Sequence, residues 1–171
     1  MTRPFFLAPA VLLLASPVLA EDFQTIGLIE AEFDGETLSQ TTMSYLDKGR
    51  RLATASLSTV MGMTSLTIQG AEGKPITIEA MFTNTEPDPQ SNLIGLSVGY
   101  FPSGMRSYWS SEDAPEPAQM TFERLDTADD NLHASGTFAA LLCFVPEGAY
   151  GADTDNCQPI AGRFETGLIR E

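Results

Sequence analysis

Turn-forming residues recur at regular intervals along this chain, and this spacing is the feature that most limits what it can fold into. Clusters of glycine, proline, aspartate and asparagine stand roughly eight to twelve residues apart, and the segments between them are rich in Thr, Ile, Phe, Val and Tyr. The clusters are 34–35, 47–49, 70–73, 86–89, 102–104, 112–117, 126–130 and 146–156. Short segments of this composition between frequent turns are typical of antiparallel strands.

Alternation of apolar and polar residues supports the same fold class. From Lys74 to Thr83, apolar residues fall on one face of an extended chain and polar residues on the other, which is the period of a half-buried strand. The apolar residues are Ile76, Ile78, Ala80 and Phe82. No window holds a helical period with caps, so the sequence predicts an all-β domain, a single antiparallel β-sandwich or small β-barrel. Residues 53–60 are open to two interpretations, a strand or a short helix.

The N-terminal segment has the layout of a secretory signal peptide. Arg3 precedes an apolar run, and Val18-Leu19-Ala20 supplies small residues around a cleavage point. The run is shorter than the roughly 20 residues that span a bilayer, and prolines interrupt it. We therefore expect residues 1–20 to be removed and residues 21–171 to form one domain. We expect that domain to be periplasmic or secreted, without membrane insertion after cleavage.

Charge and residue counts argue against several classes of partner. The chain carries 23 acidic and 9 basic residues, a net charge of −14. Such a surface repels phosphate backbones and anionic lipids, so we expect no nucleic-acid partner. One histidine and two cysteines are too few for a conventional zinc site, and no cofactor is predicted.

The two cysteines, Cys143 and Cys157, are expected to form a disulfide. An exported protein meets oxidising conditions, and neither CxxC spacing nor neighbouring histidines indicate another role for the thiols. If the cysteines face each other across two antiparallel strands, aromatic residues of one strand lie opposite glycines of the other and cover them. The pairs in this register are Phe138 with Gly162, and Phe164 with Gly136.

Two sequence patterns suggest a metal site, but neither is sufficient to predict one. The loop between the cysteines contains oxygen donors at Asp153, Asp155 and Asn156, but it lacks the order of a calcium-binding loop. Met61-Gly62-Met63 suggests thioether ligands for copper(I). The other internal methionines are scattered, and filling gaps in a core explains them more simply. No metal site is predicted.

A GxSxG sequence at 95–99 matches the nucleophile elbow of serine hydrolases, with Ser97 as the nucleophile and His133 further along the chain. That elbow needs a strand, a tight turn and then a helix. Here Tyr-Phe-Pro-Ser-Gly follows, which disfavours a helix. The interpretation we favour is a strand that uses its glycines for close packing, with His133 at the surface.

Aromatic residues are concentrated between Val98 and Trp109, and this segment is the best candidate for a functional patch. The candidate residues are Tyr100, Phe101, Arg106, Tyr108 and Trp109. Such residue types anchor protein interfaces, and they also fill sandwich cores. The sequence therefore favours a non-enzymatic binding or accessory module that recognises an extracytoplasmic protein or small ligand. The alternatives are a small barrel that carries an apolar ligand in its interior, and, less favoured, a serine hydrolase acting through Ser97.

Overall fold

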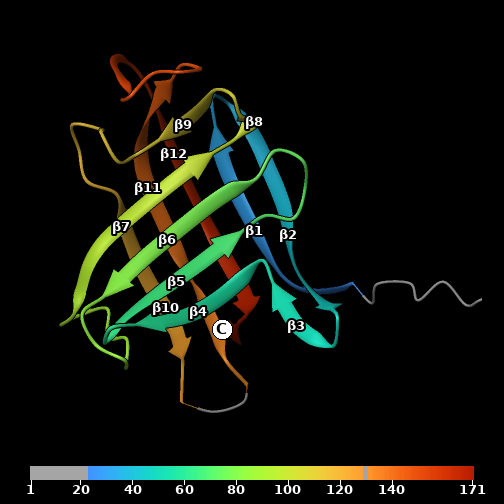
Figure 1. Ribbon diagram of the computed structural model, residues 1–171. Coiled ribbons are helices and arrows are strands. Elements are labelled where there is room, and N and C mark those ends of the chain that lie inside the picture. The colour runs from blue at the N-terminus through green and yellow to red at the C-terminus, as the bar shows by residue number, and fades with distance from the viewer. Residues whose placement is uncertain (1–22, 129–130) are drawn as a thin grey trace, which may run out of the picture.

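The computed structural model describes residues 23–128 and 131–171, and within them the chain forms strands and no helix (Figure 1). The expected signal peptide, residues 1–20, lies outside the described residues. No helix in the described part of the chain is long and apolar enough to cross a membrane. The strands are β1 (Gln24–Phe33), β2 (Glu36–Asp47), β3 (Arg50–Ala53), β4 (Ala55–Val60), β5 (Met63–Gln69), β6 (Ile76–Phe82), β7 (Leu93–Tyr100), β8 (Pro102–Met105), β9 (Tyr108–Ser110), β10 (Gln119–Asp126), β11 (His133–Val145), β12 (Asp153–Gly167) and β13 (Ile169–Arg170).

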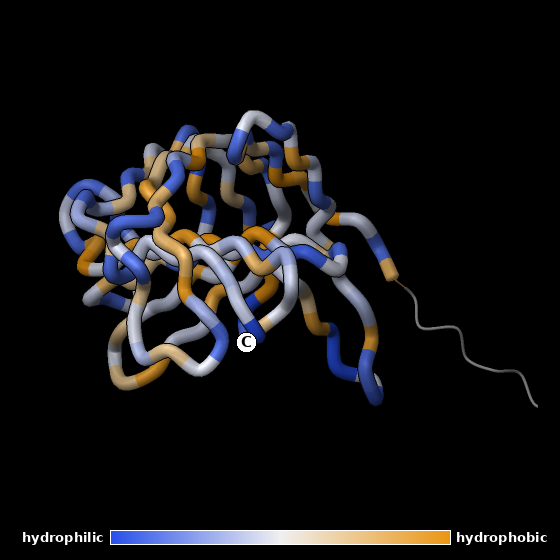
Figure 2. Tube along the Cα trace, turned by 90° about the horizontal axis from the view of Figure 1, so that it is seen from above, coloured by the Kyte–Doolittle hydropathy of each residue, from blue (hydrophilic) through white to orange (hydrophobic). Residues whose placement is uncertain are grey.

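Twelve of these strands belong to one sheet, in the order β13-β4-β5-β6-β7-β9-β11-β12-β1-β2-β3, with β10 also paired to β11. Neighbouring strands are antiparallel, except that β13 pairs with β4 in parallel. The sheet curls over, so that β4 to β7 cross in front of β11, β12 and β1 (Figure 1). Seen from above, two layers of the curled sheet face each other (Figure 2). The all-β, antiparallel prediction is confirmed, and the architecture is one continuous curled sheet.

Buried hydrogen bonds join the two ends of this sheet. The side chain of Gln40 on β2 is 5% exposed and reaches the start of β6: its Nε2 donates to the Lys74 carbonyl over 2.6 Å, and its Oε1 accepts from the Ile76 N–H over 2.8 Å. Gly70 leaves the space that this amide occupies, because a Cβ there would lie 1.9 Å from Gln40 Oε1. A backbone bond from the Thr54 N–H to the Met43 carbonyl, 2.8 Å, adds to the connection.

The alternation of apolar and polar residues correctly predicts which side chains of β6 are buried in the core. The four apolar residues of β6 are fully buried, while Glu79 between them is exposed. They pack with inward residues of β1, β4, β5, β11 and β12 in one cluster. Residues 53–60 are extended, because Ala55 and Leu57 alternate inward on β4 and are fully buried. Of the two interpretations of residues 53–60, the strand is correct.

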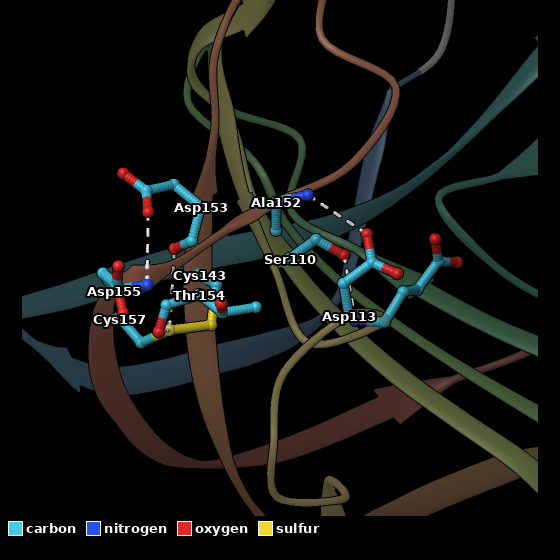
Figure 3. The surroundings of a disulfide bond; sticks show 9 residues. Ser110, Asp113, Cys143, Ala152, Asp153, Thr154, Asp155 and Cys157 are labelled. Carbon is cyan, nitrogen blue, oxygen red and sulfur yellow. Dashed lines mark hydrogen bonds between the residues drawn. A yellow bond between two sulfur atoms is a disulfide. The ribbon is translucent and has the colours of Figure 1, made fainter.

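The disulfide and its register are as predicted. Cys143 pairs with Cys157 across β11 and β12 with a Cα–Cα distance of 4.0 Å (Figure 3). The ladder continues to the two aromatic–glycine pairs, Phe138 with Gly162 and Gly136 with Phe164. The Phe138 ring does cover Gly162, since a Cβ there would lie 2.8 Å from Phe138 Cζ.

The second glycine, Gly136, is approached closely by a further strand. A Cβ on Gly136 would meet the backbone of β10, 2.2 Å from the Thr121 carbonyl oxygen. β10 pairs with β11 on the side away from β12, and this pairing has a bulge after Phe122. The register of β11 with β12, deduced from the disulfide, could not predict where β10 approaches β11.

Candidate recognition surface

The aromatic segment between Val98 and Trp109 is divided between two faces of the sheet. Tyr100 and Trp109 are paired across β7 and β9, and both point inward. Their rings pack edge-on against Phe33, with centroids 5.2 and 5.3 Å away. Burial, and secondarily the negative charge of Glu36, raises the pKa of the Tyr100 hydroxyl above its ordinary value. These two residues of the predicted patch therefore belong to the core.

Phe101 and Tyr108, one position away from the inward pair, lie on the outer surface. Their rings are half-buried and stacked, with centroids 5.1 Å apart and planes 20° from parallel. Gly99 makes the stack possible, because a Cβ there would lie 2.8 Å from Phe101 Cε2. The stack is therefore supported from below by the bare backbone of β7.

A shallow depression of about 180 Å³ lies beside the stacked rings. Ser97 and Gly99 contribute small residues to it, and Glu79 and Glu112 contribute carboxylates. Met105, which is 79% exposed, lies at the same depression and was not selected from the sequence. The depression thus combines apolar, hydroxyl and acidic groups, which are the chemical types that orient a bound partner.

The five residues predicted as a patch are thus only partly brought together. Phe101 and Tyr108 form the outer stack, Arg106 is exposed in the turn between them, and Tyr100 and Trp109 face the core. The alternation of a strand could have separated the two pairs in advance, since residues 100 and 101, like 108 and 109, are sequence neighbours.

The GxSxG motif lies within a strand. Ser97 is in the middle of β7, which is extended from Leu93 to Tyr100, and it pairs with Glu79 of β6. No turn or helix follows it at the point where a nucleophile elbow needs one. His133 starts β11 and is half-buried, with its Nε2 3.9 Å from Glu165 Oε1. The motif therefore supplies small outward residues to the surface depression.

The loops near the disulfide are fixed by carboxylates. Asp113 Oδ2 accepts a hydrogen bond from the Ala152 N–H over 3.1 Å, which ties the 112–117 loop to the loop that the disulfide encloses (Figure 3). Asp153 Oδ1 accepts from the Asp155 N–H over 3.2 Å, as in a solvated turn. Within residues 23–128 and 131–171, no three His, Cys, Asp or Glu side chains form a group suited to a metal ion.

The expectation that the scattered methionines outside the Met-Gly-Met turn fill the core is wrong for two of them, Met81 and Met105. Met61, Met63, Met81 and Met105 are exposed. Three of these four lie near one another at the end of the sheet formed by β4, β5 and β6, away from the aromatic stack. Alternation in 76–82 could have placed Met81 on the outer face, because it lies between the inward residues Ala80 and Phe82.

The inside of the curled sheet holds one cluster of buried apolar side chains. Phe122 lies between Phe82 and Phe164, with centroid distances of 6.4 and 6.0 Å. Phe82 and Phe164, which point inward, therefore belong to an aromatic group within that cluster.

No protein-family model, curated protein or solved structure matches this chain. Its function must therefore be inferred from the geometry of its own residues.

Proposed function

We propose that this protein is a binding or accessory module that recognises an extracytoplasmic protein partner through its outer aromatic surface. That surface consists of Phe101, Tyr108, Met105 and Arg106 with the depression beside them. The observation that supports the proposal is the half-buried, stacked Phe101–Tyr108 pair on the outer surface, held over Gly99. Rigid aromatic groups at a surface lose little conformational freedom on binding, so they often supply most of an interface's binding energy.

The chemistry of the surroundings narrows the class of partner. The net charge of −14 disfavours nucleic acids and anionic membranes, and the carboxylates of Glu79 and Glu112 beside the stack favour a partner with basic groups at its contact point. The disulfide and the N-terminal segment support a periplasmic or secreted location. The contacting rings of the interior favour recognition over carriage of an apolar ligand.

A comparative capture experiment tests this role. The wild-type protein and the F101A/Y108A double variant are each immobilised and exposed to the extracytoplasmic fraction of the cell that makes them. Captured proteins are quantified by mass spectrometry. Removing one well-packed interface aromatic often costs about 2 kcal/mol or more, so a partner bound through the stack should be recovered at least about tenfold less by the variant.

The matched control is Tyr150→Ala, which removes a fully exposed aromatic residue from the loop enclosed by the disulfide. This control should capture the partner as the wild type does. Equal recovery of every captured protein by the wild type and the F101A/Y108A variant would refute recognition by the stack, provided that circular dichroism shows both to be folded.

A further inference from the structure

The turn between β4 and β5 places a methionine where the backbone disfavours it. Val60 pairs with Met63, and the two residues between them both have positive φ, 53° at Met61 and 82° at Gly62. This is the geometry of a two-residue hairpin turn whose first position suits Asn, Asp or Gly. The corresponding position holds Asp34 in the turn between β1 and β2 and Lys48 in the turn between β2 and β3, with φ 51° and 50°. Met61 is 95% exposed, so core packing does not account for a methionine there.

Two further methionines lie on the outer face of the strands that follow this turn. On β5, Thr64 and Leu66 point inward and are buried, so Met63 points outward. On β6, Met81 points outward and pairs with Ser65. Met63 and Met81 are therefore diagonal neighbours on adjacent strands, a separation that long side chains can bridge. Each is 43% exposed, and both thioethers are within reach of solvent.

The third observation is an acidic depression beside this turn. A hollow of about 560 Å³ lies between Gly62, at the tip of the hairpin, and the 84–92 loop. Glu86 and Asp88 line it. Hydrogen bonds from Ser91 and Gln90 lower the pKa of the Asp88 carboxyl, which favours its ionised form. Carboxylates facing a hollow raise the local concentration of cations.

Thioether sulfur is a soft, neutral ligand that binds copper(I) and poorly binds hard cations such as Ca²⁺ or Mg²⁺. Met61 and Met63 lie two residues apart at the β4–β5 turn, and Met81 lies on the adjacent strand β6, so three exposed thioethers lie at the same end of the sheet. We propose that Met61, Met63 and Met81 form a surface site for a soft monovalent cation, of which copper(I) is the natural example. The site is separate from the aromatic surface and does not depend on the function proposed for it.

Competition for copper(I) tests this assignment directly. The purified, disulfide-bonded protein is added to the coloured copper(I)–bicinchoninate complex in the presence of ascorbate, and the loss of colour measures transfer to the protein. We expect the wild type to remove one equivalent of copper(I). The M61L/M63L/M81L variant keeps the apolar bulk without the sulfur and should bind at least tenfold more weakly. Met105→Leu, which removes an exposed thioether elsewhere on the surface, should bind as the wild type does.

A second variant separates metal binding from turn stability. Met61→Asn suits the positive φ of the turn, so it should unfold at the same or a higher temperature than the wild type while binding copper(I) several-fold more weakly. Silver(I), a soft ion that undergoes no redox change, should shift the methionine methyl resonances of residues 61, 63 and 81 in the NMR spectrum and leave that of Met105 unchanged.

Three results would overturn the assignment. The first is a wild type that removes no copper(I) from bicinchoninate. The second is equal binding by the wild type and the triple leucine variant. The third is zinc binding that is lost in the E86Q/D88N variant and retained in the triple leucine variant, which would make this a carboxylate site. If copper(I) does not bind, the exposed methionines would instead be interpreted as an adaptable docking surface.

Discussion

Replacing Gly162 with alanine should destabilise the protein strongly, because β12 passes too close to β1 at this point to accept a side chain. An added Cβ would lie 2.2 Å from the Glu30 carbonyl oxygen, 2.8 Å from Phe138 Cζ and 2.9 Å from Ala31 Cα. Ordinary carbon contacts begin near 3.5 Å, so relief requires a movement of roughly 1 Å or more. Part of that movement must come from backbone, since the Phe138 ring accounts for only one of the three contacts.

The expected cost follows from two contributions. Overpacking a tight site costs about 1 to 3 kcal/mol, and separating β12 from β1 weakens ladder hydrogen bonds worth about 1 kcal/mol each. We therefore expect Gly162→Ala to lower the free energy of unfolding by about 3 kcal/mol. For a domain of this size that corresponds to a fall in Tm of roughly 6 to 12 °C.

Urea denaturation followed by far-ultraviolet circular dichroism measures this loss, with Gly73→Ala as the matched control. A Cβ at Gly73 would meet nothing within 4 Å, and its backbone is not in the left-handed region. The control should therefore be neutral or slightly stabilising. A Gly162→Ala protein within about 0.5 kcal/mol of the wild type would refute the close approach of β12 to β1.

Three further predictions concern stability. Reducing the Cys143–Cys157 disulfide, which joins residues 14 apart, should cost about 3 kcal/mol in the chain-entropy account; urea midpoints measured with and without reductant test this, and unchanged midpoints would contradict it. Gln40→Leu should cost about 2 kcal/mol by leaving the Lys74 carbonyl and the Ile76 N–H without their buried partner, and a loss no larger than that of Gln90→Leu, in an exposed loop, would count against the bridge. The raised pKa of Tyr100 means that the unfolded chain loses this proton first, so its contribution to stability is complete below pH 10.0 and is lost as the pH rises through the higher folded value. Tyr100→Phe should reduce the fall in unfolding free energy above that pH, and an identical alkaline profile in both proteins would show the assignment to be wrong.

The strands and the C-terminal register could be predicted because both depend on local information. Alternation in 76–82 identifies a half-buried strand whatever lies around it, and the Cys143–Cys157 pair fixes the register of β11 and β12 from there back to His133 and Gly167. The shift that pairs Phe144 with Asp153, and the close approach of β10 to Gly136, could not be deduced from the two cysteines. The hydrogen bonds of the Gln40 side chain could not be predicted either, since its partners, Lys74 and Ile76, lie 34 and 36 residues further along the chain.

The candidate surfaces could be predicted in part for similar reasons. The segment around Phe101 and Tyr108 was identified by its composition, but composition cannot assign rings to one face or the other. Applying the two-residue period to 100–101 and 108–109 would have separated core from surface. Exposure of Met63 and Met81 depends on which neighbouring strands leave their outer face uncovered, and that follows from the curl of the whole sheet.

The division of the aromatic segment between two faces has a practical consequence. Trp109, the only tryptophan in the chain, lies next to Tyr108 on the same strand but on the opposite side of the sheet. Because the two residues share one short strand, we expect a molecule bound to the outer stack to alter the surroundings of the indole that packs against Phe33. The protein therefore carries its own optical reporter, and a change in intrinsic emission would reveal an occupied outer surface without a label.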